Sequence, residues 1–314
     1  RLVGRLASTV EHRLVLRLAD RTDFALAGIP VRAVPANLPA GRGFLASDHI
    51  ETQLCLLDSD PSGAAQLRAL SDIAVAATAR DAHFSRDHLP RRVDPLPTRI
   101  GLDAASTGRP TPIRGSAAIV VGVGGDELGA VQIDLLETGP GFVIAGPSRS
   151  GRSSTLATVA VGLRRNGWRV VLVTARPTPA SAFADAVFDA RDPGFDAATR
   201  EPAEPLAVLV DDAELVTETP AAGTLDRFIR SARDAGYVVV IAGTTDDLSV
   251  GFRGFVVDAR RSRTGVLLTP RSSLDGEVLG VRLPRDTGGS RLPPGRGLLV
   301  SRGESTALQA ALPE

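Results

Sequence analysis

The chain has 314 residues, of which 43% are hydrophobic and 23% charged, as expected of a globular protein with a sizeable core. Its 36 basic and 36 acidic residues give a formal net charge of zero, which argues against a protein that wraps nucleic acid through bulk charge. The single cysteine excludes an internal disulfide and fits the cytosol, and no apolar run approaches the roughly 20 residues that span a bilayer.

A short repeat indicates a tandem organisation. The sequence LPAGRGFL at 38–45 recurs as LPPGRGLL at 292–299, which is 254 residues later (292 minus 38). A period of this length is far too long for a solenoid and fits tandem domains of similar fold. The chain also begins with Arg1 rather than Met, which suggests a piece of a longer protein.

These observations predict three regions. Residues 1–60 would be the C-terminal tail of a preceding domain, residues 61–115 a helix and a linker rich in proline and arginine, and residues 116–314 a complete domain. In the middle region Ser62 can begin a helix, whose apolar positions are Leu67, Leu70, Ile73 and Val75. The alternative is one continuous domain in which the two repeated segments match by chance.

The last region reads as alternating strands and helices. After a predicted hairpin at 117–123 and 128–136, the expected strands are 142–145, 168–174, 205–212, 237–245, 254–260 and 264–269. The expected helices are 152–164, 180–186 and 224–236. Apolar strands without alternation, separated by helices, predict an α/β fold with a mainly parallel sheet covered on both faces.

The segment GPSRSGRSS at 146–154 has the spacing of a phosphate-binding loop, G-x-x-x-x-G-K-[ST]. Two glycines permit the tight curl that aims backbone N–H groups at a phosphate, and the following helix presents its positive end to the same point. A strand-to-helix turn without a ligand is the alternative. The candidate nucleotide-binding residues are Gly146, Pro147, Ser148, Arg149, Ser150, Gly151, Arg152, Ser153 and Ser154.

Arg152 stands where the motif has lysine. Arginine is larger, planar and forked, so we expect it to bind phosphate but to place its charge badly on a transferred group. The sequence contains no lysine at all, which fits a GC-rich genome and makes this substitution less diagnostic of lost function.

Two further strand ends carry polar residues. Asp211 ends a buried strand, where P-loop proteins place the carboxylate of the magnesium shell, and Ser153 would be the hydroxyl ligand. Asp212 follows where many such ATPases have glutamate, and its shorter side chain would aim less well at a water. Thr244 or Thr245 could sense a γ-phosphate, or could simply cap a loop. The Asp-Asp pair could likewise be a strand-ending turn or a helix cap.

Three arginines lie on the predicted helix 224–236, namely Arg227, Arg230 and Arg233. A solvated helix face is the favoured interpretation. The alternative is an arginine at a subunit interface that acts on a neighbour's nucleotide in a ring.

Taken together, the segments GPSRSGRSS, AVLVDD, ARDAGYVVVIAGTT and LPPGRGLL resemble the FtsK/SpoIIIE family of ring ATPases. The tandem arrangement is most similar to EccC-type proteins, the multi-ATPase motors of type VII secretion in actinobacteria, whose later ATPase domains often carry damaged loops. Arg152, Asp212 and Thr245 depart from the active pattern of the family, with Thr245 at the position of a glutamine.

The resemblance implies a RecA-like P-loop domain preceded by the tail of an FtsK-like domain. It implies ATP and Mg²⁺ as cofactors, Asp212 and Arg152 as catalytic residues of weak or no activity, and Ser153 and Asp211 as the metal ligands. The implied partners are neighbouring ATPase domains of the same polypeptide, a hexameric ring and a secreted helical peptide, at the cytoplasmic side of the membrane within a longer anchored protein. A DNA translocase of the FtsK type and a nucleotide-free structural adaptor are the alternatives.

Overall fold

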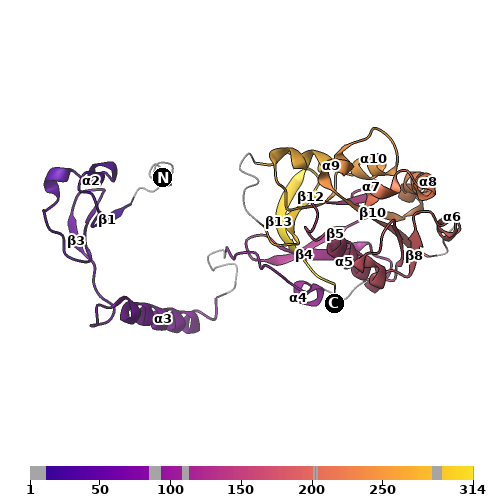
Figure 1. The fold of residues 1–314 in the computed structure, drawn as a ribbon. Coiled ribbons are helices and arrows are strands. Elements are labelled where there is room, and N and C mark those ends of the chain that lie inside the picture. Colours follow the sequence, from indigo (N-terminus) through magenta and orange to yellow (C-terminus); the bar gives the residue numbers. More distant parts are fainter. Residues whose placement is uncertain are drawn as a thin grey trace. The chain divides into compact units, whose positions relative to one another are not determined.

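The computed structural model describes residues 12–84, 93–107, 113–200, 202, 204–284 and 292–313. The chain divides into two compact units, Arg1–Pro90 and Arg91–Glu314 (Figure 1). Within the described ranges, no helix has the length and apolar character needed to cross a membrane. Parts of the predicted linker, residues 85–92 and 108–112, lie outside the described residues.

The first unit contains a small antiparallel sheet in the order β1-β2-β3. Its core includes Val15, Phe24, Ile29 and Phe44, with the rings of Phe24 and Phe44 edge to face at 6.4 Å between centroids. The elements are β1 (Leu14–Leu16), α2 (Asp23–Leu26), η1 (Val31–Ala33), β2 (Arg42–Leu45), β3 (Glu51–Gln53) and α3 (Gly63–Arg80).

Helix α3 confirms the helix predicted to begin at Ser62. The hydroxyl of Ser62 accepts a hydrogen bond from the backbone N–H of Ala65 at 3.3 Å, which satisfies one of the free donors at the start of the helix. Ala65 is the buried residue of this helix. The predicted apolar positions are exposed: Leu67, Leu70, Ile73 and Val75.

The second unit is built on a ten-stranded sheet in the order β5-β4-β13-β12-β11-β6-β10-β9-β7-β8. The strands β11, β6, β10, β9, β7 and β8 are parallel to one another, whereas each adjacent pair from β5 to β11 is antiparallel. The strands are β4 (Ala118–Gly124), β5 (Gly129–Asp134), β6 (Gly141–Ala145), β7 (Arg169–Thr174), β8 (Ala186–Asp189), β9 (Leu206–Asp211), β10 (Val238–Gly243), β11 (Gly265–Leu268), β12 (Arg296–Ser301) and β13 (Glu304–Ala310).

Helices cover both faces of this sheet, as the continuous apolar strands predict. Helix α5 packs against one face, and α8 and α10 pack against the other. The helical elements are α4 (Leu102–Ala105), α5 (Arg152–Arg165), η3 (Pro179–Phe183), α6 (Gly194–Thr199), α7 (Ala213–Val216), α8 (Pro220–Ala235), α9 (Thr245–Ser249), α10 (Phe255–Arg260) and η4 (Ser273–Leu279).

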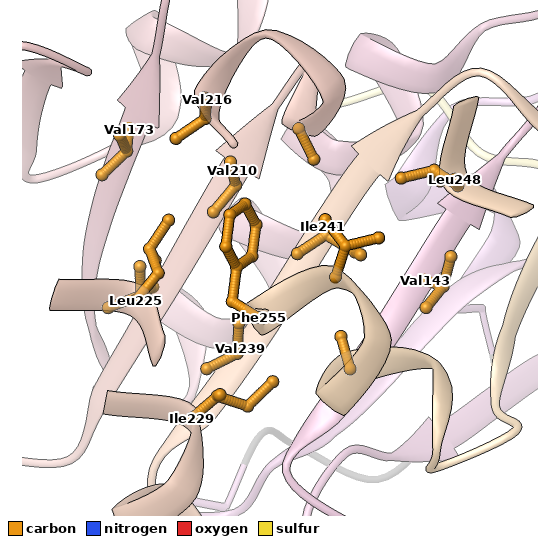
Figure 2. Packing of buried hydrophobic residues seen from close by; sticks show 14 of the residues in the cluster. Val143, Val173, Val210, Val216, Leu225, Ile229, Val239, Ile241, Leu248 and Phe255 are labelled. Atoms are coloured by element: carbon orange, nitrogen blue, oxygen red, sulfur yellow. The ribbon is translucent and has the colours of Figure 1, made fainter. Parts of the chain in front are cut away.

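Successive residues of each central strand enter opposite cores. In β10, Val239 and Ile241 belong to the core beneath α8 and α10, whereas Val238 and Val240 belong to the core beneath α5. Figure 2 shows the first of these cores, in which the Phe255 ring lies among aliphatic side chains from the sheet and the helices. The two cores fix the strands from both sides, so the carboxyl edge of the sheet is a rigid base for a site.

Two predicted elements are wrong. Residues 254–260 form helix α10 rather than a strand, because Phe255, Val256 and Ala259 share one face at helical spacing and Gly254 opens the turn with φ of 97°. The predicted helix at 180–186 is a short 3₁₀ helix, Pro179–Phe183, followed by the edge strand β8. The hairpin and the remaining predicted strands and helices of the second unit are confirmed within a few residues.

Residues 93–107 pack with the second unit. Leu102 and Ala105 of α4 are buried against Val123 and Ala311. Just before α4, Gly101 forms a β-bridge with Leu312. This segment therefore contributes to the fold of the second unit. The sequence had predicted that the domain begins only at residue 116.

Candidate nucleotide-binding site

The candidate site lies at the carboxyl edge of the parallel strands, where open α/β sheets place their ligands. The loop 146–151 connects β6 to α5, and Asp211 ends β9. Strand β10 lies between β6 and β9, and Thr244 and Thr245 follow it. The topology thus gathers the loop, the two aspartates and the two threonines at one edge of the sheet.

Two residues in the left-handed region close the loop. Arg149 has φ of 64° and Gly151 has φ of 101°, a conformation that favours glycine. At Gly146 a methyl group would lie 2.6 Å from the Ser150 hydroxyl and 2.8 Å from the Leu268 carbonyl oxygen, so only glycine fits there. Both glycines of the predicted motif are therefore required by the backbone.

The loop offers donors that lack partners. The first intrahelical bond is donated by Thr155 to Gly151, and no acceptor is recorded among the described residues for the N–H groups of 152–154. Ser150 is 4% exposed, and its hydroxyl is also without a partner in the described structure. Free amides at the positive end of a 14-residue helix, with a buried unpaired hydroxyl beside them, are a suitable environment for an anion.

Arg152 turns back into the loop. Its Nη1 donates to the Gly146 carbonyl oxygen at 3.0 Å, and its Nη2 donates to Asp212 Oδ1 at 3.2 Å. The side chains of Arg152 and Asp212 are each 12% exposed, so this ion pair is largely shielded from solvent. The cation that the motif supplies to a phosphate is thus held by a carboxylate of the protein itself.

A second arginine, which the sequence analysis missed, holds the other oxygen of Asp212. Arg176 follows β7 and donates from Nε at 3.0 Å and from Nη2 at 2.5 Å to Asp212 Oδ2. The hydrogen bonds and the charge of Asp212 raise the pKa of the Arg176 guanidinium. Asp212, with φ of 48°, therefore bridges two arginines and does not point freely toward a water. The end of β7 reaches this site only because β7 is the neighbour of β9, and the sequence alone carries no signal for that order.

Asp211 is also occupied by the protein. It is 1% exposed, its Oδ2 accepts a hydrogen bond from the Thr178 hydroxyl, and its Oδ1 accepts one from the Asp212 N–H at 3.1 Å. In the part of the chain that the structure describes, no group of three or more His, Cys, Asp or Glu residues could hold a metal ion.

Glu214 is a second residue that the sequence analysis missed. Burial raises the pKa of its carboxyl, and the nearby Arg152 opposes this shift only in part. Its Oε2 has no partner among the described residues and lies 2.5 Å from where a methyl group on Gly243 would stand. Glu214 therefore occupies the space between the ends of β9 and β10, where Asp212 was expected to act.

The two threonines after β10 have different roles. Thr244 caps α9, since its hydroxyl accepts a hydrogen bond from the Asp247 N–H at 3.2 Å and donates to Asp247 Oδ2 at 2.5 Å. Thr245 is 7% exposed, and its hydroxyl has no partner in the described structure. Of the pair, Thr245 is the one that retains a free polar group.

The arginines of α8 fit the solvated-face interpretation. Arg227 forms an ion pair with Asp196, and Arg230 Nε lies 3.6 Å from Asp258 Oδ2. The side chains of both arginines are 65% exposed. Such exposed pairs add little to stability.

The sequence matches no protein-family model and none of the curated proteins. Among solved structures, the chain is similar to ATPases 2 and 3 of EssC from Geobacillus thermodenitrificans, with a TM-score of 0.61 and 18% identity over 99% of this chain and 62% of that one. It is also similar to ATPases 2 and 3 of Thermomonospora curvata EccC in complex with a signal sequence peptide, with a TM-score of 0.59 and 20% identity over 99% and 60%.

A third similar structure is the pCW3 conjugation coupling protein TcpA with ATPγS, at a TM-score of 0.51 and 15% identity over 69% of this chain and 71% of that one. The present chain spans 62% of the EssC structure and 60% of the EccC structure. The fold that the chain shares with these structures is an α/β fold with a large, mostly parallel central sheet and helices. The chain therefore has the α/β fold of the P-loop ATPase domains of EccC and EssC.

Proposed function

We propose that this chain is an ATP-binding module of a multi-domain secretion motor, with little or no hydrolysis of its own. The observation that carries the proposal is the loop 146–151, because the amides that follow it at the start of α5 have no partner among the described residues. These donors suit the phosphates of a nucleotide. The fold shared with the ATPase domains of EssC and EccC supports the assignment to such a motor.

Weak or absent turnover follows from the side chains around the loop. Arg152 binds Asp212, and Asp212 is held in addition by Arg176. A nucleotide must therefore compete with an internal ion pair before its phosphates meet the arginine. Asp212 is engaged by two arginines and Asp211 is buried under Thr178, so neither aspartate at the end of β9 is free to orient a water. If Mg²⁺ accompanies the nucleotide, Ser153 and Asp211 are the residues to hold it.

We also propose that residues 1–60 are the C-terminal tail of a preceding FtsK-like domain. The order and antiparallel pairing of β1-β2-β3 repeat those of β11-β12-β13. Arg42 Nε donates to Gln53 Oε1 at 2.9 Å, as Arg296 Nε donates to Gln309 Oε1 at 3.1 Å. Each glutamine then donates to a carbonyl two residues before its arginine, to Ala40 at 3.2 Å and to Pro294 at 2.9 Å. These matching hydrogen bonds support a common origin of the two segments.

The partners follow from this organisation. We propose that the module works beside other ATPase domains of one polypeptide, in a ring, at the cytoplasmic side of a membrane to which a longer protein is anchored. The EccC structure contains a signal sequence peptide, and binding of a secreted helical peptide is part of the proposal for this chain. DNA is the less favoured substrate, since the formal net charge is zero.

The test compares ATP binding and hydrolysis by the wild-type chain and by the double variant Arg152→Lys with Asp212→Glu. We expect the wild type to bind ATP without appreciable turnover, and the double variant to bind ATP and gain measurable hydrolysis. A wild type that hydrolyses ATP as fast as an intact motor would contradict the proposal of a weakened module.

A nucleotide-free adaptor is the second candidate, and the Arg152–Asp212 ion pair favours it, because the charge of Arg152 is already neutralised by a carboxylate of the protein. The same titration separates the two functions. Absence of ATP binding in both proteins would support the adaptor, whereas saturable binding by the wild type would exclude it.

A further inference from the structure

The start of β12 supports the phosphate-binding loop from behind. The backbone N–H of Gly295 donates to the Ser150 carbonyl oxygen at 2.7 Å. A methyl group on Gly151 would lie only 2.9 Å from the Gly295 nitrogen, so the two backbones are in direct contact. The curl of the loop therefore depends on where the Gly295 N–H points.

Gln309 sets the orientation of that N–H. It is 2% exposed on β13, and its Nε2 donates to the Pro294 carbonyl oxygen at 2.9 Å. On the other side of Gly295, the Ala310 N–H donates to the Gly295 carbonyl oxygen at 2.7 Å. The peptide groups on both sides of Gly295 are thus fixed to β13, and Gly295 itself has φ of 81°.

Arg296 connects this support to a distant segment of the second unit. Its Nε donates to Gln309 Oε1 at 3.1 Å, and its Nη2 donates to the carbonyl oxygens of Leu96 at 2.9 Å and Pro97 at 2.8 Å. The planar guanidinium of Arg296 can donate to Gln309 and to the two carbonyl oxygens at the same time, whereas a lysine has a single nitrogen and could not. A continuous chain of hydrogen bonds thus runs from residues 96–97 to the loop.

We propose that Gln309 and Arg296 are positioning residues for the phosphate-binding loop, and that they make its affinity for a polyphosphate depend on the segment 96–97. This inference rests on the proposed function of the loop. Neither side chain needs to touch the nucleotide, because both act through the Gly295–Ser150 hydrogen bond. If that bond is lost, the amides of 152–154 no longer converge on one point.

The first unit supplies a matched control. Arg42 and Gln53 form the same side-chain pair on β2 and β3, and they belong to the other compact unit. Replacing them removes the same kinds of hydrogen bonds from the chain without altering the support behind the loop.

The test uses the whole chain and measures the Kd for ATP and for inorganic pyrophosphate, at a temperature where every variant is folded. We expect Gln309→Leu to weaken both ligands by the same factor, about tenfold, since one buried hydrogen bond near the loop is worth this order of affinity. Gln309→Glu keeps the acceptor for Arg296 but loses the donor to Pro294, and should weaken binding similarly. Arg296→Lys should have a smaller effect in the same direction, and Gln53→Leu and Arg42→Lys should have none.

A purely structural role would lower the melting temperature and leave the Kd values unchanged, which would overturn the inference. Amide hydrogen exchange without ligand gives a second readout. The Gly295 and Thr155 amides should exchange at least about tenfold faster in Gln309→Leu than in the wild type or in Gln53→Leu. If the wild type binds neither ligand, the proposed function fails, and the exchange rates alone decide whether Gln309 shapes the loop. Unchanged exchange would then overturn the inference.

Discussion

Arg152 Nη2 lies 3.2 Å from Asp212 Oδ1, so the cation at the start of α5 is paired with the carboxylate that was expected to orient a water. The same Asp212 binds Arg176 through its other oxygen. Arg152 and Asp212, the two side chains expected to act on a nucleotide in an active ATPase, thus neutralise each other.

Asp212→Asn should raise the affinity for ATP. The neutral amide no longer holds Arg152, and it removes a negative charge near the phosphates. We expect the affinity for ATP to rise about tenfold, which corresponds to roughly 1.4 kcal/mol of binding free energy. This is a modest part of the interaction energy of a shielded ion pair such as Arg152–Asp212. Isothermal titration of both proteins measures the change.

The matched control is Asp246→Asn, which removes the same charge from an exposed residue near the same edge of the sheet. It should alter the Kd much less than Asp212→Asn. Equal gains in the two variants would mean that long-range charge, rather than release of Arg152, governs binding.

Gly151→Ala should abolish binding and destabilise the fold. Its φ of 101° is strained for alanine, and the added methyl group would lie 2.9 Å from the Gly295 nitrogen. The cost is about 1–3 kcal/mol of unfolding free energy, measurable in urea. Gly236→Ala is the comparison, since Gly236 has φ of 69° but open space around it. That variant should lose stability while ATP binds normally; a loss of binding there would show that the assay reports unfolding instead of the loop.

Glu214→Gln should change how stability depends on pH. Burial raises the pKa of this carboxyl above the ordinary 4.5, so the folded chain binds its proton more tightly than the unfolded chain does. The free energy of unfolding therefore falls as pH rises from the ordinary pKa through the raised one, and stays lower above it. Glutamine removes this fall, so the variant should be more stable than the wild type at neutral pH.

Urea unfolding between about pH 4 and pH 8 tests the Glu214 prediction. Glu218→Gln provides the control, because Glu218 is an exposed residue of the same region. Parallel stability curves for the wild type and Glu214→Gln would rule out a buried carboxyl at this position.

Phe255→Ala should cost about 3–5 kcal/mol of unfolding free energy, because the ring is 2% exposed in the core of Figure 2. Val257→Ala should cost much less, since Val257 lies on the half-buried face of α10. A strand would place these two residues on the same face and make both changes costly. Similar losses would therefore favour the strand that the sequence predicted.

Much of the fold follows from local sequence patterns. The loop at 146–154 and the strands beside it were predicted because glycine spacing and apolar runs are local signals. Helix α10 was misjudged because Val256 and Val257 favour strands, whereas in the structure this segment packs as a helix on α8, β6 and β10. In contrast, Arg176 and Glu214 reach the site through the order of strands β10-β9-β7, which the sequence does not specify.

The rotamer of Arg152 was equally beyond prediction. From the sequence, an arginine at this position of the motif is expected to bind phosphate but to place its charge badly on a transferred group. Its choice of Asp212 and the Gly146 carbonyl depends on the position of two strand ends and on Arg176, all of which are tertiary features.

The most direct measurement is a titration of the isotope-labelled chain with ATP, followed through the backbone amide resonances of Gly151, Arg152, Ser153 and Ser154. A triphosphate held by the cradle predicts saturable shifts centred on these four amides, with a sharp change in the Arg152 side-chain signal as it leaves Asp212. No shift at these amides at millimolar ATP, with the protein folded throughout, would contradict nucleotide binding and leave an adaptor that keeps only the form of the loop.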